Sequence, residues 1–385
     1  MITVRDCADA GDLRAAWRIR ALAFGGPREP DDAWPAGGWR GWVASLDGTV
    51  CAFARAWPYR QFYGGVAVPT AGLASVAVDP HARGRGVASA LLDGVLPALR
   101  AAGQPLSALY PSVLSLYRSR GWEQVGVYEW VEFPTSTLLA VPRPSAPVEL
   151  RPASVADLPA LHECYVRLAS TIDGMLDRAG PPFEPARLLE LDVVTVAAGP
   201  DGPRGYLGAT RDEPGLVVYD LVALDLDASL ALLRSVASWA GQLSTVRMRL
   251  MEPRWLLSAQ LGVTLTSDPW MLRVVDLPAA VAARGWPRAA LLRPGLAADI
   301  EVVDEHAPWH AGRHRLVVDG GAVAISAGGS GAVRLTARGL AAWYAGSASS
   351  GQLRRAGLLA GDPTHAAVLD ALTGTPGGAR IANAF

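Results

Sequence analysis

The sequence predicts a mixed α/β fold in which two related α/β units are followed by a third unit of α+β type. The first of three observations is a strand, a glycine-rich loop and a helix between Leu73 and Ala102. The second is a pattern that returns 146 positions later, and the third is a change of pattern from Leu277 onward. A chain of 385 residues is also too long for one compact core. We expect the domains to span residues 1–141, 142–276 and 277–385.

The first unit begins with an alternation of short strands and helices. Ile2–Arg5 reads as a strand, and Asp12 is placed to cap a following helix that carries Leu13 and Trp17 at helical spacing. The segments 39–46 and 50–63 then read as a hairpin closed at Asp47-Gly48. The second of these strands is rich in aromatic residues, some of which we expect to face a pocket or a neighbouring subunit. These aromatic residues are Phe53, Trp57, Tyr59, Phe62 and Tyr63.

An aperiodic segment at 27–38 separates the first helix from the hairpin. It carries Glu29, Asp31 and Asp32, whose carboxylates would attract a cationic amine if they lined a pocket. The alternative is a solvated acidic loop with no binding role.

The segment Leu73–Val78 is apolar and partly β-branched, and Asp79-Pro80 ends it. A loop from Arg83 to Ala88 follows, and a helical pattern then runs to Ala102, where Pro97 predicts a kink or an early end. The two glycines of the loop let the backbone approach a ligand closely, and the first amides of the helix have no intrahelical partner. This arrangement predicts a phosphate site. The unit then continues with a strand at 106–109, a helix at 111–120 and a strand at 122–133.

The second unit repeats the first. Arg5 and Arg151, like Asp79 and Asp225, are separated by 146 positions, and apolar residues recur around both pairs. After Asp225 the chain enters a helix with no glycine and no arginine in between. We therefore expect the second unit to be a degenerate copy that cannot cradle a phosphate.

The third unit has a different order of elements. Ile300–Val303 and Arg313–Val318 read as strands, Asp319-Gly320-Gly321 as a hairpin turn, and Val333–Tyr344 as a strand that leads into a helix.

Bulk composition excludes several classes of protein. A formal net charge of -1 provides no basic surface for nucleic acid. No apolar run approaches the ~20 residues of a membrane helix and no secretory signal begins the chain, so we expect a cytoplasmic protein without stable membrane association. Cys7, Cys51 and Cys164 are odd in number and far apart, which argues against a disulfide framework. Only 18% of residues are charged against about 25% in average soluble proteins, which favours a homo-oligomer.

Two motifs in the first unit carry a resemblance to a known family. Residues 83–88, Arg-Gly-Arg-Gly-Val-Ala, fit the pattern R-x-x-G-x-A after the strand Val76-Ala77-Val78, and residues 117–122 fit Y-x-x-x-G-aromatic. Together they resemble the acetyl-CoA site of the GNAT superfamily of N-acetyltransferases. Residues 333–344 and 352–357 resemble the sterol carrier protein fold, and the whole order of units resembles the Eis (enhanced intracellular survival) family of acetyltransferases.

The resemblance implies acetyl-CoA as cosubstrate and a role for each motif. The loop amides would hold the pyrophosphate, the strand amides would polarise the thioester carbonyl, and the segment 27–38 would form part of the acceptor pocket. The residues implied at the acetyl-CoA site are Val76, Ala77, Val78, Arg83, Gly84, Arg85, Gly86, Val87 and Ala88, and no metal is implied.

Tyr117 and Phe385 are the implied catalytic residues. Tyr117 would donate a proton to the departing thiolate, which its ordinary pKa near ~10 permits; the alternative is a core tyrosine. The strand before the loop carries no carboxylate, so the base must lie elsewhere. In the Eis family the α-carboxylate of a terminal aromatic residue enters the active site, and this chain ends at Phe385. An ordinary packed terminus, with His81 as the base, is the alternative.

The predicted activity is acetyl transfer from acetyl-CoA to a primary amine of a bulky, multiply aminated small molecule that resembles an aminoglycoside or polyamine. Protein lysine acetylation and a non-catalytic lipid-binding or ligand-binding scaffold are the alternatives. The family resemblance further implies a hexamer.

Overall fold

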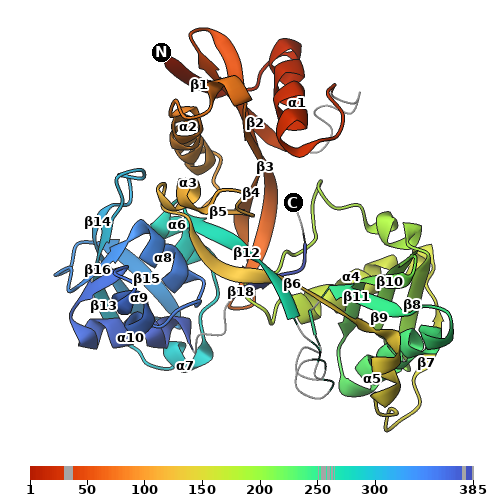
Figure 1. Cartoon of the computed structure of the whole chain (residues 1–385). Coiled ribbons are helices and arrows are strands. Elements are labelled where there is room, and N and C mark those ends of the chain that lie inside the picture. Colours follow the sequence, from red (N-terminus) through yellow and green to blue (C-terminus); the bar gives the residue numbers. More distant parts are fainter. Residues whose placement is uncertain are drawn as a thin grey trace.

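The computed structural model of the chain describes residues 1–29, 38–249, 251–252, 257, 261, 263, 265–374 and 379–383. Three units surround two long strands, β3 (Thr49–Tyr63) and β4 (Val66–Val78), which run from the first unit into the centre of the molecule (Figure 1). The first unit also contains β1 (Ile2–Asp6), α1 (Ala10–Phe24), β2 (Arg40–Leu46), α2 (Val87–Ala101), β5 (Leu106–Leu109), α3 (Leu114–Arg118) and β6 (Glu123–Pro134).

The second unit repeats this order of elements, as the sequence predicts, except that no counterpart of α3 precedes its last strand among the described residues. It contains β7 (Glu149–Pro152), α4 (Leu158–Ala169), β8 (Val193–Gly199), β9 (Gly202–Asp212), β10 (Gly215–Ala223), α5 (Leu226–Ala237), β11 (Thr245–Arg249) and β12 (Leu265–Val274). The repeat extends to side chains, because Arg5 binds Asp12 in the first unit and Arg151 binds Asp157 in the second. In both units this pair fixes the first strand to the start of the first helix.

The two units exchange their last strands. In the described part of the chain one 13-stranded sheet has the order β1-β2-β3-β4-β5-β12-β6-β11-β10-β9-β8-β7, with β18 (Ala379–Ile381) paired to β6. Strand β12 of the second unit therefore lies beside β5 of the first, and β6 of the first lies beside β11 of the second. Because β6 and β12 also pair with one another, the units share one continuous sheet. Since these strands cross between units, the boundary at 141/142 stays a prediction.

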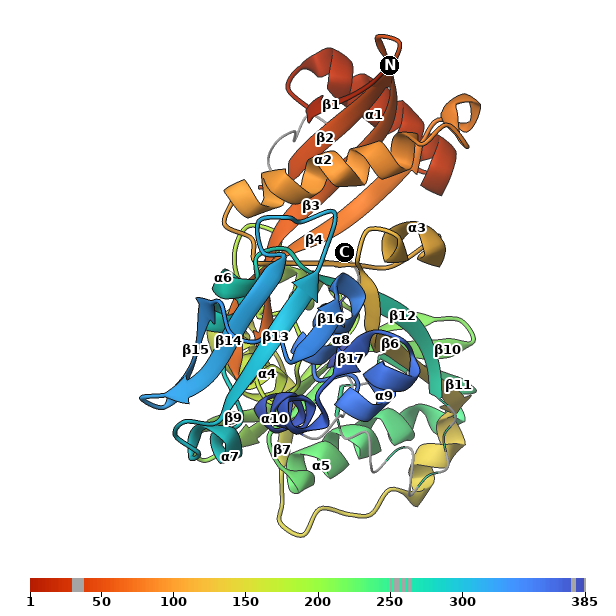
Figure 2. The same cartoon turned by 90° about the vertical axis from the view of Figure 1, so that its left-hand side faces the viewer.

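The third unit has a five-stranded sheet of order β15-β14-β13-β16-β17 packed against helices (Figure 2). Its elements are α6 (Leu277–Ala283), α7 (Arg288–Leu291), β13 (Ala297–Val303), β14 (Gly312–Asp319), β15 (Ala322–Ala327), β16 (Val333–Thr336), α8 (Ala337–Tyr344), α9 (Ser350–Arg355), β17 (Leu359–Gly361) and α10 (Pro363–Thr373). A buried ion pair between Arg273 of β12 and Asp304, 2.6 Å apart, fixes this unit to the shared sheet. The mixed α/β architecture with a third α+β unit is confirmed.

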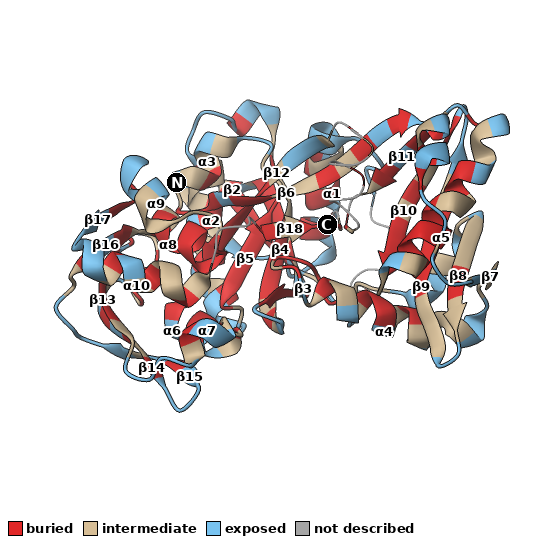
Figure 3. Ribbon diagram, turned by 90° about the horizontal axis from the view of Figure 1, so that it is seen from below, coloured by how far each residue is buried: buried red, intermediate tan, exposed pale blue. Residues whose placement is uncertain are grey.

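Three local expectations are corrected. The cap of α1 is Asp9, whose side chain accepts from the amide of Asp12, because the Asp12 carboxylate is engaged by Arg5. Helix α2 continues through Pro97 to Ala101. Four of the five aromatic residues of β3 are buried (Figure 3). Phe53 packs within the first unit, whereas Tyr59, Phe62 and Tyr63 are buried because the other units cover this strand where it enters the centre.

Candidate active site

The glycine-rich loop has the geometry of an anion site. Gly86 is the N-cap of α2 in a left-handed conformation, with φ 78°, and no side chain caps the helix. A Cβ added at Gly84 or Gly86 would meet no atom of the chain within 4 Å. The first amides of α2 thus have no side-chain cap among the described residues, and free amides at a helix N-terminus can bind phosphate. Arg83 is anchored by its Nε, which donates to the carbonyl of Val78 at 3.2 Å.

The strand before the loop opens away from its neighbour. Strand β5 pairs with β4 only over Thr70–Gly72, so in the described part of the chain the edge of β4 from Leu73 onward is not covered by β5. On its other edge β4 pairs with β3, with a register shift between Ala74 and Ala77 and a positive φ of 54° at Ser75. This β-bulge bends β4, and the bend brings Val76 to Val78 to the entrance of the gap between β4 and β5.

A cleft of about 310 Å³ lies where β4 and β5 separate. Tyr117 lines it from α3, opposite the uncovered edge of β4. The cleft is lined by Arg20, Phe24, Arg55, Leu73, Ala74, Ser75, Val76, Tyr110, Ser112 and Tyr117. The structure thus brings the predicted Val76 and Tyr117 together in one cleft, and places the loop 83–88 directly beyond the end of β4.

Tyr117 is buried but its hydroxyl has no hydrogen-bond partner among the described residues. The ring packs edge-on against Trp122, with 6.4 Å between centroids, which fixes its orientation. Burial raises the pKa of Tyr117 to about 12, so the hydroxyl keeps its proton throughout the neutral range. A positioned, protonated hydroxyl at the cleft is what a general acid requires.

Phe385 lies outside the described residues, but the structure describes residues 379–383 of the same end of the chain. Strand β18 pairs in parallel with β6, from Ala379 opposite Gly126 to Ile381 opposite Tyr128. The carbonyl of Asn383 accepts a hydrogen bond of 2.6 Å from the hydroxyl of Tyr110, a residue that lines the cleft. The chain is therefore beside the cleft two residues before its terminal carboxylate.

Residues 379–383, here called the tail, pack so closely against the first and second units that glycine is required at two contact positions. A Cβ at Gly126 would lie 1.9 Å from the carbonyl oxygen of Ala379, and one at Gly174 would lie 2.7 Å from that of Arg380. The side chain of Arg380 reaches Glu252 at 2.9 Å, and the amide of Arg380 donates to the carbonyl of Asp173 at 2.8 Å. First and second units thus both hold the tail.

The other predicted residues take less central places. His81 is exposed on the short 3-10 turn η1 (Pro80–Ala82) and is not among the residues that line the cleft. Arg85 is exposed and lies 3.9 Å from Asp47. Glu29 is exposed, whereas Asp31 and Asp32 lie outside the described residues.

The second unit lacks the anion site. Helix α5 is capped by Asp225, whose side chain accepts from the amide of Ala228, at the position where α2 has Gly86. Its carboxylate also binds Arg204 at 2.6 Å. A negative charge already occupies the helix N-terminus, which disfavours a pyrophosphate there.

The residues of the cleft that sequence reasoning missed include Arg20, Arg55 and Tyr110. Arg55 lies over the rings of Trp39 and Trp57, at 5.6 and 5.1 Å from their centroids. Burial and the neighbouring charge of Arg20 lower the pKa of Arg55. An arginine among the aromatic residues of a strand was the available signal, but only the fold places it opposite Arg20.

The comparisons with known proteins agree with this architecture. Residues 4–125 match the acetyltransferase (GNAT) domain and residues 277–379 the sterol carrier protein domain. An uncharacterised N-acetyltransferase of Streptomyces avermitilis is 32% identical over 347 residues, which cover 82% of each chain. The crystal structure of a GCN5-related N-acetyltransferase from Kribbella flavida superposes with a TM-score of 0.82 at 29% identity, covering 100% of this chain and 98% of that one. Eis1 from Mycobacterium abscessus shares the fold, with a TM-score of 0.77 at 21% identity over 100% of both chains.

The fold and the comparisons define an N-acetyltransferase. The chain belongs to the GNAT family, in the form that carries two tandem GNAT units and a sterol-carrier-like third unit. Among the described residues, no helix is long and apolar enough to cross a membrane.

Proposed function

We propose that this chain transfers an acetyl group from acetyl-CoA to a primary amine of a bulky small molecule. The observation that carries the proposal is the uncovered edge of β4, which faces Tyr117 and leads directly to the uncapped N-terminus of α2. Acetyl-CoA would supply the thioester, with its pyrophosphate on the amides from Gly86 to Ala88 and its acyl end along Val76 to Val78.

Acetyl transfer needs two proton transfers, and a different group of the chain would carry out each of them. Tyr117 holds a proton at its hydroxyl beside the cleft and would give it to the leaving sulfur. The α-carboxylate of Phe385 would accept the proton of the amine, and the tail contacts at Asn383 and Arg380 would position it. His81, which lies away from the cleft lining, is the alternative base.

The cleft favours some acceptors over others. The sequence predicts a multiply aminated acceptor, either aminoglycoside-like or a polyamine, which Glu29, Asp31 and Asp32 would attract if their segment lined the pocket. The described lining instead presents Arg20 and Arg55, whose Nε atoms are buried without a hydrogen-bond partner. These two guanidinium groups favour a second class, an amine that also carries a carboxylate, because an anion would relieve their mutual repulsion.

A panel of paired acceptors separates these classes. Release of free CoA thiol is measured with kanamycin, spermidine, a lysine-containing peptide, and two pairs that differ by one carboxylate: lysine with 1,5-diaminopentane, and tryptophan with tryptamine. Preference for kanamycin or spermidine supports the polycationic class, and preference for lysine and tryptophan supports the carboxylate class. Turnover with the peptide alone supports protein lysine acetylation. If no amine is acetylated while acetyl-CoA binds, the scaffold alternative replaces the enzyme.

We also infer a homo-oligomer in the cytoplasm, with a hexamer as the form that the family resemblance suggests. The support is the low charged fraction of the chain, and sedimentation velocity of the purified protein tests it.

A further inference from the structure

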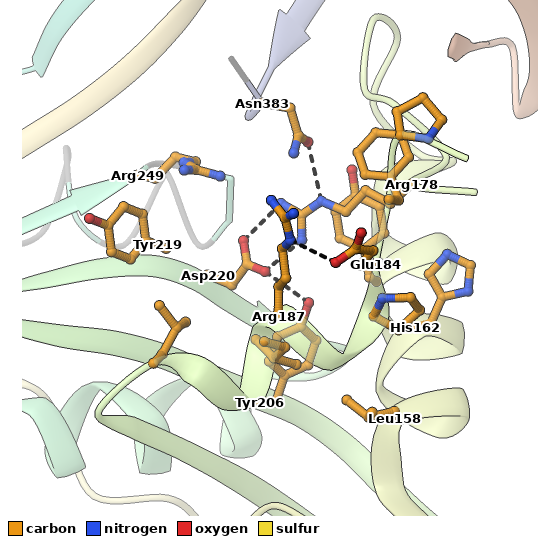
Figure 4. Close-up of a pocket in the computed structure, with 16 residues that line it drawn as sticks. Leu158, His162, Arg178, Glu184, Arg187, Tyr206, Tyr219, Asp220, Arg249 and Asn383 are labelled. Atoms are coloured by element: carbon orange, nitrogen blue, oxygen red, sulfur yellow. Dashed lines mark hydrogen bonds and ion pairs between the residues drawn. The ribbon is translucent and has the colours of Figure 1, made fainter. Parts of the chain in front are cut away.

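A second cavity, of about 580 Å³, lies in the second unit at the position that corresponds to the cleft of the first (Figure 4). Strand β10 pairs with β11 only over Gly215–Val218, and its pairing with β9 shifts register between Val218 and Asp220. Tyr219 and Asp220 therefore line this cavity just beyond Val218, the last residue of β10 that pairs with β11. Leu73 and Ala74, 146 positions earlier, line the first cleft in the same way.

An ion pair at the centre of the cavity carries no net charge. Arg178 binds Asp220 through both terminal nitrogens, at 2.5 and 2.8 Å, and the Tyr206 hydroxyl donates to the same carboxylate at 3.1 Å. Burial acts to raise the pKa of the Asp220 carboxyl, but the charge and hydrogen bonds of Arg178, the charge of Arg249 and the hydrogen bond of Tyr206 together hold that pKa below its ordinary value. Asp220 is thus ionised at neutral pH, and the pair leaves no net charge for a ligand.

Arg249 adds a second positive charge beside this pair, so the group formed by Arg178, Asp220 and Arg249 has a net charge of about +1. No carboxylate among the described residues pairs with Arg249; its Nη1 donates to the carbonyl of Ala382 at 2.6 Å, and its Nε is buried with no hydrogen-bond partner. The rings of Trp130 and Tyr219 each lie 5.4 Å from its guanidinium carbon. Figure 4 shows Arg249 and Tyr219 on one side of the central cluster and His162 and Leu158 on the other. Because these rings lie over the guanidinium group of Arg249, its edge, which carries the N–H donors, is left to bind an anion.

Apart from His162 and the exposed pair of Glu184 and Arg187, the remaining wall is mostly apolar. Leu158, Phe183 and Leu188 line it, and the ring of Tyr165 lies 3.9 Å from the guanidinium carbon of Arg178. A largely apolar cavity of this size with a few convergent polar groups has the usual character of a small-molecule site. The capping of α5 by Asp225 disfavours a second molecule of acetyl-CoA as its ligand.

We propose that this cavity is a second ligand site, separate from the acetyl-transfer cleft, for a small organic monoanion with an aromatic or aliphatic body. The carboxylate would bind Arg249 and the body would lie against Phe183 and Leu188. Asn383 also lines the cavity, so the ligand would contact the tail that leads to Phe385.

Isothermal titration calorimetry of the full chain with 1-naphthaleneacetate and with 1-naphthaleneacetamide tests the charge requirement. The acetate is expected to bind one site per chain at least ~10-fold more tightly than the amide, a difference of about 1.4 kcal/mol. Arg249→Gln should reduce acetate binding to the level of the amide, and Arg249→Lys should retain part of the preference.

Arg187→Gln is the matched control, because Arg187 lines the same cavity but is 69% exposed and already paired with Glu184 at 2.9 Å. It should leave acetate affinity within about twofold. If Arg249→Gln does not fold, Leu158→Trp replaces it, because added bulk at the apolar end should weaken both compounds. Absence of acetate binding, equal binding of acetate and amide, or displacement of the acetate by saturating acetyl-CoA would overturn the proposal. None of these readouts depends on acetyl transfer.

Discussion

The Tyr110 hydroxyl donates a hydrogen bond of 2.6 Å to the carbonyl of Asn383, and this contact joins the cleft of the first unit to the end of the chain. Tyr110 follows β5 and Asn383 follows β18, so the two residues are 273 positions apart. Burial raises the pKa of Tyr110 far above its ordinary value, so the donor keeps its proton throughout the neutral range. The tail is therefore held beside the cleft by a contact that does not titrate in that range.

Gly126→Ala should displace the tail without touching the acetyl-CoA site. Its Cβ would lie 1.9 Å from the carbonyl oxygen of Ala379, so β18 must shift. A displacement near 1 Å at a reacting group lowers rates by about 10²-fold. We expect kcat to fall by this amount and the Kd of acetyl-CoA to stay within twofold, measured by steady-state kinetics and calorimetry.

Gly241→Ala is the control, because a Cβ there meets no atom within 4 Å and the residue lies in the second unit away from the tail. Its kcat should equal that of the unmodified chain. Normal turnover by Gly126→Ala would show that the position of the tail does not matter for catalysis.

A matched pair of variants separates the effect on the anion site from the backbone strain that a side chain causes at a glycine with positive φ. Gly86→Val should weaken acetyl-CoA binding at least ~10-fold, because it places a side chain where the phosphate must lie. Gly103→Val is a matched control: Gly103 has φ 72° against 78° for Gly86, and its Cβ would also meet no atom within 4 Å, but it lies beyond the opposite end of α2. Both variants should lose similar stability in thermal unfolding, and Gly103→Val alone should keep its acetyl-CoA affinity. Equal affinity in the two variants would remove the loop from the site.

The sequence could predict features that neighbouring residues specify, but not features that depend on contacts between distant segments of the chain. The loop at 83–88, the strand at 106–109 and the hairpin of the third unit were predictable, because turn residues and short-range periodicity specify them. The exchange of β6 and β12 was not, since it depends on pairing between strands more than a hundred positions apart. Tyr59, Phe62 and Tyr63 of β3 were misjudged for the same reason, because the residues that bury them include residues of the other units.

The residues of the candidate site fall into the same two groups, those that a local motif predicts and those that only the fold brings to the cleft. Motifs identified Tyr117 and the loop, whereas Arg20, Arg55 and Tyr110 enter the cleft only through the packing of α1, β3 and β5. The buried pair of Arg178 and Asp220 was equally invisible, because Arg178 lies in an aperiodic segment of the second unit.

Tyr117→Phe should lower kcat by roughly 10²-fold and leave KM nearly unchanged, because the ring keeps its packing on Trp122 while the proton donor is lost. The pKa of about 12 gives the pH dependence its sign. A tyrosine donates below its pKa, so ionisation of Tyr117 cannot reduce activity below about pH 10. Any alkaline loss of activity in the unmodified enzyme below that pH should therefore persist in the variant. A variant with unchanged kcat would make Tyr117 a core residue.

Asp220→Asn should destabilise the second unit, because it leaves the buried Arg178 guanidinium without its counter-charge. Breaking a buried pair in this way costs about 3 kcal/mol or more of unfolding free energy. Glu184→Gln is the control, since its pair with Arg187 is exposed and should contribute under about 1 kcal/mol. The pKa of Asp220 is lowered in the folded state, so its stabilisation is present above the unfolded pKa near ~4 and is lost as the pH falls through the folded value. Denaturant unfolding at pH 7 should show the difference between the two variants, and equal midpoints would contradict it.

The terminal carboxylate itself is tested by moving it. Appending two residues after Phe385 converts its carboxylate to a neutral amide, whereas deleting Phe385 moves the charge back by about 3.5 Å and removes the ring. Both changes leave the loop and β4 intact, and the contacts of Tyr110 and Arg249 with residues 382–383 should still hold the tail. We therefore expect unchanged acetyl-CoA affinity and a kcat lower by roughly 10²-fold, the usual scale of a lost general base. His81→Gln provides the comparison, since it removes the alternative base and should leave turnover unaffected. An extended chain that acetylates as fast as the original, together with a slow His81→Gln variant, would transfer the role of base to His81.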